Sequence, residues 1–361
     1  MDLFSTILGA ALLLCGVIAT GLLVLKYKSR KKMLLPTFKS VLVTGCDRGF
    51  GFMLAKRLDE EGFKVFAGCL DATGEGAKEL QMDTSPKLEL IQLDVTKEKE
   101  IEEAKAKIID SLAGYMLWAV VNNAGVACHA EFEWIPKRSF QHTIDVNILA
   151  VVNVTRAFLP LVRAAKGRIV NMASMAGRTA TPGFTAYSAS KFAVIGFSES
   201  LRREMAHFGV KVITVEPAIY KYVQLSVRDF QIDYSVTALS STTNFLGQCE
   251  EFWAQAEPGI KRDYGEPYFL ATQEAKSRLL QWTSPALDEV VDCYMHAVAS
   301  VQPHSRYVPP WKLQLLNDVM NMLWNSVQDR ILAAVMNIRA KPDMLRPIQN
   351  GRTGRRRSHA T

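Results

Sequence analysis

The chain has 361 residues, 48% hydrophobic and 22% charged, so it can bury the core of one large domain or two small ones. Its net charge of +7 is concentrated at the ends, because residues 26–39 carry six basic side chains and no acid, and residues 341–361 carry six against one aspartate. Residues 40–340 therefore have a net charge of −3, and we expect no nucleic-acid partner.

The first expected element is a membrane helix at residues 3–25, which are uncharged and long enough to cross a hydrocarbon core about 30 Å thick. A cleaved signal peptide would have a basic start, whereas the only early charge is Asp2. Residues 26–37 form a basic juxtamembrane linker, and positive flanks favour the cytosolic side. We expect a single-pass membrane protein with a cytosolic domain, in the endoplasmic reticulum or alternatively a mitochondrial membrane.

Apolar runs that resemble strands alternate with amphipathic runs after this linker. The strand-like runs begin at residues 40, 64, 88, 118, 168 and 211, and the helical patterns lie at 51–61, 98–113, 137–165 and 188–207. Alternation of this kind implies right-handed crossovers and a parallel sheet buried on both faces. The pattern predicts an α/β fold with a Rossmann-like doubly wound parallel sheet, in a single catalytic domain of residues 38–310 that follows the transmembrane helix.

The first of these strands ends in a glycine-rich loop, "VLVTGCDRGFG", at residues 41–51. Gly45 allows a tight turn, Gly49 lets the backbone approach a pyrophosphate, and Gly51 permits close packing of helix on strand. The helix that follows would direct unpaired N–H groups and its positive dipole end at the phosphates. The loop therefore predicts a dinucleotide site.

The stretch "TAYSASK" places Tyr187 one helical turn before Lys191. A free phenol has a pKa near 10 and is a poor acid or base at neutral pH. A lysine ammonium on the same helix face would lower the pKa of Tyr187 toward a useful range. The pair alone is common on ordinary helices, so the surrounding motifs decide its meaning.

The C-terminal part of the chain breaks the alternating rhythm. Residues 218–285 mix aromatic, acidic and polar side chains, and we expect a substrate lid there. Residues 311–340 have the pattern of amphipathic helices, and residues 341–361 are expected to form a mobile basic tail. The six cysteines show no metal-like spacing, so we expect no disulfide framework and no metal site, and a reducing compartment.

Five motifs occur in order over about residues 38–310: the glycine loop, "LDVT" at 93, "NNAG" at 122, Asn147 in "DVNIL", and Ser174 with "YSASK". Together they resemble the short-chain dehydrogenases/reductases. The resemblance implies that Tyr187 exchanges a proton with the substrate oxygen and that Ser174 orients this oxygen. It also implies that Lys191 tunes Tyr187 and binds the nicotinamide ribose, while Asn147 holds a water that links Lys191 to solvent.

The same resemblance implies a set of residues that would contact the cofactor. These are Gly45, Arg48, Gly49, Gly51, Asp71, Asp94, Val95, Asn122, Ala124, Gly125, Lys191 and Pro217. Asp71 is the first acid after the second strand and would suit the ribose of NAD, whereas Arg48 would suit the 2′-phosphate of NADP. The cofactor is expected to be NAD, with NADP as the alternative.

One stretch departs from the family pattern. "VEPAIYKYV" has Ala218 where the family usually has glycine, and no threonine follows nearby to hold the nicotinamide amide. Alanine adopts a positive φ less cheaply than glycine, so the substitution puts this part of the cofactor site in question.

Local segments such as "FLPLVRAAKGRIVNMASM" and "TSPALDEVVDCYMHA" are similar to the subgroup that holds 3-hydroxybutyrate dehydrogenase, 17β- and 11β-hydroxysteroid dehydrogenases of type 2 and the retinol dehydrogenases. With the membrane helix, this implies a lipophilic secondary alcohol or ketone as substrate, a steroid or sterol first and a retinoid second. The alternatives are a 3-hydroxybutyrate-type hydroxy acid, or a cofactor-binding scaffold or redox sensor without turnover. Family members often dimerise, so a homodimer is expected as a possible assembly.

Overall fold

The computed structural model describes residues 32–220, 242–281 and 283–345. The expected membrane helix at 3–25 lies outside these ranges, as do residues 26–31 of the basic linker, residues 221–241 and 282 of the expected lid, and residues 346–361 of the basic tail. The fold and the site are built from the described residues.

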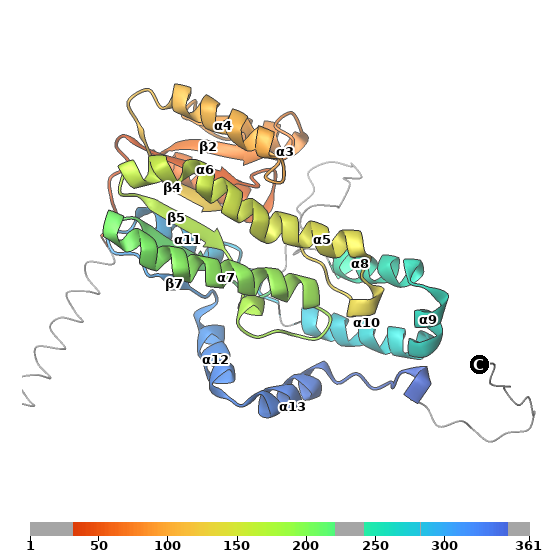
Figure 1. The fold of residues 1–361 in the computed structure, drawn as a ribbon. Helices are drawn as coiled ribbons and strands as arrows, with labels where there is room; N and C mark the ends of the chain where they lie inside the picture. Colours follow the sequence, from red (N-terminus) through yellow and green to blue (C-terminus); the bar gives the residue numbers. More distant parts are fainter. Residues whose placement is uncertain (1–31, 221–241, 282, 346–361) are drawn as a thin grey trace, which may run out of the picture.

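A seven-stranded parallel sheet forms the centre of the fold (Figure 1), with the strand order β3-β2-β1-β4-β5-β6-β7. The strands are β1 (Lys39–Thr44), β2 (Lys64–Cys69), β3 (Leu88–Gln92), β4 (Met116–Asn122), β5 (Arg168–Met172), β6 (Lys211–Val215) and β7 (Arg306–Tyr307). The order reverses between β1 and β4, which is where dinucleotides bind in sheets of this type. The prediction of a Rossmann-like doubly wound parallel sheet is confirmed.

Helices cover both faces of the sheet. The α-helices of the described residues are α2 (Gly49–Glu60), α3 (Glu75–Met82), α4 (Glu98–Ser111), α5 (Lys137–Ile144), α6 (Ala150–Ala164), α7 (Thr185–Met205), α8 (Thr242–Gln255), α9 (Pro258–Tyr264), α10 (Glu266–Leu280), α11 (Asp288–Ala299), α12 (Trp311–Met322) and α13 (Asn325–Met336). Helices α2 and α11 pack on one face, and α4, α6 and α7 pack on the other.

Strand β1 shows why the alternating runs form this sandwich. Val41 and Val43 enter the cluster beneath α2 and α11, whereas Leu42 enters the cluster beneath α4, α6 and α7. Successive strand residues point to opposite faces, so a continuous apolar run is stable only when both faces are covered. The two-residue strand β7 was not predicted, because a pair of residues carries no periodic pattern.

The predicted helix at 137–165 is one continuous helical stretch with an irregularity in its middle. A π turn at Asp145–Leu149 separates α5 from α6. Within the described residues, Lys137–Ala164 is the one stretch long and apolar enough to cross a membrane, and 44% of its most apolar window is buried. Because Val154, Phe158 and Val162 pack in the core of the fold, this stretch has the character of a core helix.

Helices α8, α9 and α10 form an extension beyond the carboxyl ends of the strands, on the right in Figure 1. An aromatic cluster joins this extension to the loop after β4: the Trp134 ring centroid lies 4.8 Å from that of Trp253, which stacks on Phe269 at 5.1 Å. The described part of the predicted lid is therefore a packed helical layer with a core of its own.

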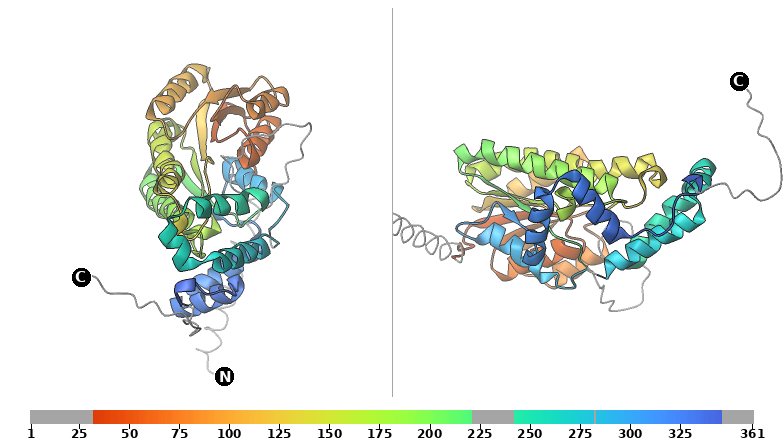
Figure 2. Two further views of the ribbon diagram at one scale, coloured as in Figure 1. Left: turned by 90° about the vertical axis from the view of Figure 1, so that its right-hand side faces the viewer. Right: turned by 90° about the horizontal axis from the view of Figure 1, so that it is seen from below.

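Helices α12 and α13 lie outside both layers and project from the body in Figure 1 and in the left view of Figure 2. Polar contacts attach α12: Thr179 donates to Asn317 Oδ1 at 2.8 Å, and Arg306 pairs with Asp318 at 2.8 Å. Arg278 of α10 donates to the backbone carbonyl of Met336 at the end of α13. The amphipathic helices predicted for residues 311–340 thus correspond to two described helices fastened at both ends.

Candidate active site

The glycine-rich loop lies at the carboxyl end of β1 and is shaped by close backbone packing. Gly45 has φ +71°, and a Cβ there would lie 2.9 Å from Ala124 Cα. A Cβ on Gly51 would collide with the carbonyl oxygen of Gly45. Gly49 has φ +66° and open space where a side chain would stand. A side chain at any of the three positions would therefore strain or fill this cradle.

Two polar side chains that the sequence analysis did not single out hold this cradle to β4. The hydroxyl oxygen of Thr44 accepts hydrogen bonds from the N–H groups of Asn123 and Ala124, both at 3.0 Å. The amide of Asn123 donates to the carbonyl of Thr44 at 2.9 Å and to that of Gly45 at 3.2 Å. The paired asparagines of "NNAG" were the available signal, since one faces this loop and the other the interior.

The N-terminus of α2 fits a phosphate group. Its N-cap residue, Arg48, makes no side-chain capping bond to the helix, and the first turn contains no acidic residue. The first N–H groups of an uncapped helix and the positive end of its dipole favour an anion. The glycine cradle and this helix end therefore fit the pyrophosphate of a dinucleotide.

Acidic groups lie at the carboxyl end of β2, beside the same loop. The carboxylate of Asp47 accepts hydrogen bonds from the backbone N–H groups of Leu70 at 2.9 Å and Asp71 at 3.1 Å. Asp71 binds Thr73 through that residue's N–H and hydroxyl groups. The loop thus presents two carboxylates where the sequence analysis considered only Asp71.

Two more of the residues predicted to contact the cofactor, Asp94 and Val95, follow β3. Asp94 accepts hydrogen bonds from the N–H and the hydroxyl of Thr96, and Lys97 pairs with it at 3.3 Å. Val95 is buried in the cluster on the α4 face. This turn is fixed by its own side chains and lies at the same sheet edge as the glycine loop, since β3, β2 and β1 are neighbours.

Tyr187 and Lys191 lie near the start of α7, and both are buried. The Lys191 ammonium lies 5.5 Å from the centre of the Tyr187 ring and donates to the carbonyl of Met172 at 3.0 Å. Ser174 follows β5, and its hydroxyl oxygen accepts the N–H of Ala176 at 3.1 Å. The fold therefore brings three of the four predicted catalytic side chains to one place.

Burial shifts the ionisation of these groups. Burial raises the pKa of Tyr187 to about 12, against a hydrogen bond with Ser174 that lowers it. Burial also lowers the pKa of Lys191 to about 8. Loss of solvation is the largest effect on the pKa of Tyr187 in this structure, and the lowering by Lys191 stays a prediction.

Asn147, the fourth predicted side chain, sits in the π turn. Its Oδ1 accepts the N–H of Val126 at 2.8 Å, while its Nδ2 donates to the carbonyl of Val126 at 2.8 Å and to Ser190 Oγ at 3.0 Å. A Cβ on Gly125 would lie 3.3 Å from Asn147 Oδ1 and 3.7 Å from Lys191 Nζ. The wide turn, a feature often found at functional sites, thus directs Asn147 toward Lys191.

Asn122 lies deeper than the other predicted cofactor residues. It is buried, and its amide donates to Thr155 Oγ1 at 2.9 Å and to Asn171 Oδ1 at 2.8 Å. These bonds tie β4 to α6 and β5. In the same motif Asn123 and Ala124 contact the glycine loop, and Gly125 lies beside Lys191.

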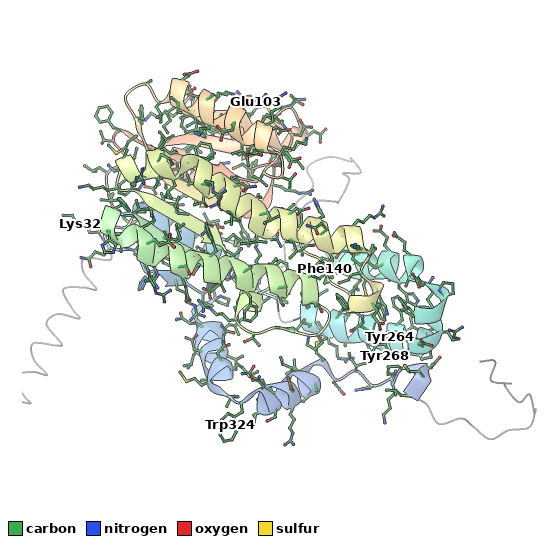
Figure 3. All side chains as sticks on the ribbon, in the orientation of Figure 1. Lys32, Glu103, Phe140, Tyr264, Tyr268 and Trp324 are labelled. Atoms are coloured by element: carbon green, nitrogen blue, oxygen red, sulfur yellow. The ribbon has the colours of Figure 1, made fainter. Side chains whose placement is uncertain are left out.

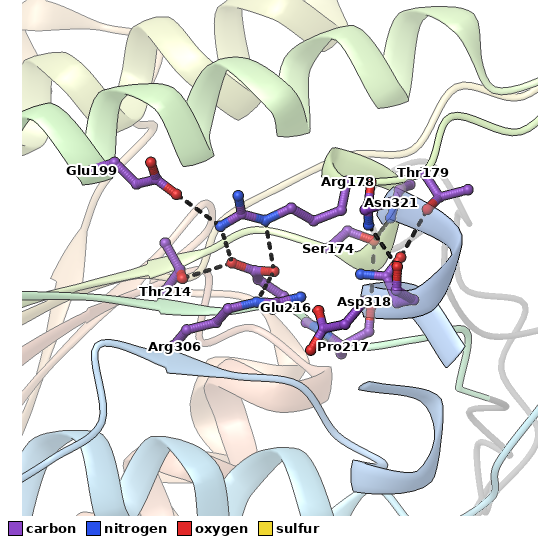
Figure 4. A network of polar contacts seen from close by, with 12 residues as sticks. Ser174, Arg178, Thr179, Glu199, Thr214, Glu216, Pro217, Arg306, Asp318 and Asn321 are labelled. Carbon is purple, nitrogen blue, oxygen red and sulfur yellow. Dashed lines mark hydrogen bonds and ion pairs between the residues drawn. The ribbon is translucent and has the colours of Figure 1, made fainter. Parts of the chain in front are cut away.

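A buried ionic network lies behind Ser174 (Figure 4). The fully buried carboxylate of Glu216 pairs with Arg178 at 3.2 Å and with Arg306 at 2.8 Å. Arg178 in turn pairs with Glu199 on α7 at 3.0 Å. This network was not predicted, because its members lie far apart along the chain.

Pro217 and Ala218 follow this carboxylate. The carbonyl oxygen of Pro217 accepts the N–H of Met175 at 3.1 Å and the hydroxyl of Ser174 at 3.4 Å, so it supports the serine loop. Ala218 donates its N–H to the carbonyl of Pro309 at 3.0 Å and does not adopt a positive φ. The departure from the family's glycine therefore causes no left-handed strain here.

Comparison with protein families gives one match to this chain: a family model described as short chain dehydrogenase aligns with residues 39–230. This range includes every residue predicted above for catalysis or cofactor binding.

Curated relatives are similar over most of the chain. The 17-beta-hydroxysteroid dehydrogenase type 6 of Bos taurus is 39% identical over 81% of this chain and 87% of its own length. Retinol dehydrogenase 16 of Homo sapiens is 36% identical over 85% of this chain and 91% of its own. A solved short-chain dehydrogenase from Streptomyces avermitilis has a TM-score of 0.61 at 24% identity, covering 81% of this chain and 94% of that one, and shows the likeness of fold.

Proposed function

Since the chain belongs to the short-chain dehydrogenase family and is an oxidoreductase of CH–OH groups, we propose that its substrate is a lipophilic secondary alcohol or the corresponding ketone. A steroid or sterol comes first and a retinoid second, in line with the names of the relatives. NAD is the proposed cofactor, and the proposed location is a membrane reached through residues 3–25.

The observation that carries this proposal is the apolar surrounding of Tyr187. The tyrosine packs with the buried side chains of Ala127 and Phe184. Partly buried Leu246 of α8 and Leu279 of α10 close around them. Burial is the largest cause of the raised pKa of Tyr187, as expected for a poorly hydrated site. A steroid or retinoid needs an apolar cleft with few polar groups, and these surroundings supply one.

The hydroxy-acid alternative needs a fixed cation for the substrate carboxylate. The described cations of the lid segment are engaged elsewhere. Lys261 donates to the carbonyl of Ala254 at 2.7 Å, Arg262 lies 3.7 Å from Asp263, and buried Lys276 donates to Cys249 Sγ at 3.1 Å. Lys221 and Arg228 lie outside the described residues. The arrangement supports the lipophilic alcohol over the hydroxy acid.

In the proposed mechanism the ionised oxygen of Tyr187 takes the proton of the alcohol, and in the reverse direction the Tyr187 hydroxyl gives that proton to the ketone oxygen. Ser174 donates a hydrogen bond to the same oxygen and stabilises the charge that develops there. Lys191, fixed by Met172, holds a positive charge beside the Tyr187 ring and favours its ionised form during transfer. The bound nicotinamide dinucleotide supplies the acceptor or donor for the hydride on the substrate carbon.

The residues proposed to hold the cofactor follow from the geometry above. The glycine cradle and the α2 N-terminus would bind the pyrophosphate, Asp94 and Val95 the adenine, and Lys191 the nicotinamide ribose. Asp47 and Asp71 place two carboxylates at the end of β2, which would repel a 2′-phosphate and accept bonds from a free ribose hydroxyl. This supports NAD over NADP, although Arg48 acts in the opposite direction.

The scaffold alternative was motivated by Ala218. Because Ala218 adopts no positive φ and its N–H is bonded, this departure supplies no structural reason for lost turnover. The convergence of Ser174, Tyr187 and Lys191 supports an active enzyme instead. The endoplasmic reticulum as location, the cytosolic orientation and a homodimer remain predictions.

The experiment that tests the proposal measures turnover by the full-length chain in phospholipid vesicles. The substrates are a hydroxysteroid, all-trans-retinol and 3-hydroxybutyrate, each offered with NAD and with NADP. We expect kcat/KM with the steroid and NAD to be the highest value. Efficient turnover of 3-hydroxybutyrate with none of the lipophilic alcohols would reverse the assignment. Cofactor binding without turnover of any alcohol would favour the scaffold.

A further inference from the structure

The two helices α12 and α13 carry an apolar face that no described part of the protein covers. Its members are Leu315, Leu316, Val319, Met322, Trp324, Ile331 and Val335, and each is at least 38% exposed. We refer to these seven side chains as the C-terminal apolar face. Figure 3 shows Trp324 at the outer edge of this hairpin, directed away from the body.

This face is held outward by polar anchors on the other side of α12. Leu315, Val319 and Met322 follow a helical spacing of four and three residues, which places them on one side of the helix. Asn317 and Met320, on the other side, are buried. Asn317 is bonded to the loop after Ser174, and Asp318 to Arg306. Turning the face inward would break both contacts, so its exposure is built into the fold.

Exposure on this scale requires an explanation. Met322 and Trp324 are each 82% exposed, which is unusual for large apolar side chains grouped together. Contiguous apolar patches rimmed by polar residues mark sites of contact with proteins or membranes. Such a patch on α12 and α13 favours a binding partner, and the charges around it bear on the kind of partner.

Basic residues adjoin this face, and the chain becomes strongly basic beyond it. Lys312 and Arg330 lie on the two helices themselves, and Arg339 and Lys341 follow α13, all exposed. Residues 346–361 add five arginines and no acid. Apolar side chains flanked by cations are the composition of helices that lie in the surface of an anionic bilayer, where tryptophan occupies the interface.

The N-terminal end of the described chain has the same composition. Lys32 and Leu34 are tied to the end of α11: Leu34 N–H donates to Ala299 at 2.7 Å, and Val301 N–H donates to Lys32 at 2.8 Å. Immediately before them stand a basic stretch and the 23 uncharged residues 3–25. Both ends of the chain therefore combine an apolar segment with a cationic flank. This composition favours contact with a lipid surface over contact with a second copy of the chain.

We propose that the C-terminal apolar face docks on the surface of an anionic phospholipid bilayer, with α12 and α13 lying in the interface. This contact is additional to the expected N-terminal anchor. It would restrain the orientation of the domain, because a single point of attachment leaves the angle to the membrane open and a second contact limits it.

The docked face adjoins the apolar cluster around Tyr187. Arg278 of α10 donates to the carbonyls of Met336 and Asn337 at the end of α13, and the next two residues, Leu279 and Leu280, belong to that cluster. Docking would thus hold the entrance for a lipophilic alcohol beside the bilayer. This consequence rests on the proposed function, whereas the docking itself does not.

The test uses depth-dependent quenching in the full-length chain. Met322→Cys is labelled with an environment-sensitive fluorophore, in a chain whose Cys15 and Cys293 are replaced by alanine, and is placed in vesicles of phosphatidylcholine and phosphatidylserine. Met82→Cys, on α3, is the matched control, because Met82 is 79% exposed and Met322 is 82% exposed. Lipids with bromine on the upper acyl carbons quench only labels that reach the hydrocarbon.

An interfacial helix lies about 5–10 Å below the headgroup boundary, so we expect quenching of about twofold or more at position 322 and none at position 82. Equal fluorescence at position 322 with brominated and ordinary lipids would overturn the proposal. Energy transfer between chains labelled at 322, without quenching by lipid, would also overturn it and assign the face to a second copy. No activity is measured, so the result is independent of the proposed reaction.

Discussion

The cofactor side of the molecule, residues 39–217, and its C-terminal helices, residues 242–345, obey different constraints. On the cofactor side, individual residues are required by backbone geometry, such as Gly45 with its positive φ and Gly51 against a carbonyl. In the C-terminal helices the side chains need only be apolar, and no particular residue type is required. Leu246 and Leu279, which contact the Tyr187 cluster, are examples. Every dinucleotide has the same pyrophosphate and therefore needs the same glycine-rich loop, whereas a lipophilic substrate needs only an apolar cleft of matching shape.

The two regions meet at Glu216. This carboxylate ends β6 and pairs with Arg178 beside the serine loop and with Arg306 of β7, which in turn holds Asp318 of α12. Glu216 therefore links the cofactor side to the C-terminal helices, and substitutions on either side of this junction should have effects of different size.

The largest effect is expected from Glu216→Ala. The substitution leaves the guanidinium groups of Arg178 and Arg306 without their shared buried partner, so the free energy of unfolding should fall by about 4 kcal/mol. Urea denaturation of the full-length chain in detergent measures this change. Glu199→Ala is the matched control: Glu199 pairs with the same Arg178 but is 38% exposed, and its loss should cost about 1 kcal/mol or less. Equal costs for both variants would show that the junction is not a buried network.

A pH dependence of stability follows from Lys191. Its pKa is lowered by burial to about 8 from an ordinary value of 10.5, so above pH 8 the folded chain releases a proton that the unfolded chain keeps. The free energy of unfolding should therefore rise with pH relative to Lys191→Met, by up to about 3 kcal/mol between pH 7 and 10.

The measurement stops at pH 10, because the raised pKa of Tyr187 reverses the sign above that value. There the unfolded chain loses the phenol proton first, and stability falls as pH rises. If the free energy of unfolding changed with pH in the same way for wild type and Lys191→Met between pH 7 and 10, the lowered pKa of Lys191 would be contradicted.

A smaller effect is expected at the ribose end of the cofactor site. Asp47→Asn removes one of the two carboxylates at the end of β2. The proposed preference for NAD, measured as the Kd of NADP divided by the Kd of NAD, should therefore fall by about tenfold, or about 1.4 kcal/mol. Titration of both cofactors measures the ratio. Asp110→Asn, at the exposed end of α4, is the control and should leave the ratio unchanged. Tighter binding of NADP by the wild type would show that Arg48 dominates.

The sequence predicted the sheet and the positions of Tyr187, Lys191, Ser174 and Asn147, because each belongs to a motif at a strand end or on a helix. The resemblance to short-chain dehydrogenases and to the steroid and retinol subgroup is confirmed by the relatives. Local pattern was sufficient for the sheet and the glycine loop, since strand ends and helix starts are set by neighbouring residues, whereas the roles of the four side chains came from the resemblance.

The features that could not be predicted from the sequence depend mostly on contacts between residues that are distant along the chain. Glu216 meets Arg306 across 90 positions, and nothing in "VEP" indicates a buried pair. The raised pKa of Tyr187 depends on the burial that α8 and α10 complete. The sequence pattern predicts an ordinary helix at Asp145–Leu149 in place of the π turn, because one extra residue barely changes the spacing of apolar residues along a helix.

The central claim is that the Tyr187 hydroxyl transfers the proton in the oxidation of a lipophilic alcohol, and Tyr187→Phe tests it most directly. The ring of the variant should still pack against Phe184 and Ala127, so the fold and the affinity for NAD should be preserved. Turnover of the best alcohol should fall by about a hundredfold or more. Tyr115→Phe, at the opposite end of β4 from the site, should retain full turnover. Wild-type turnover in Tyr187→Phe would contradict the mechanism.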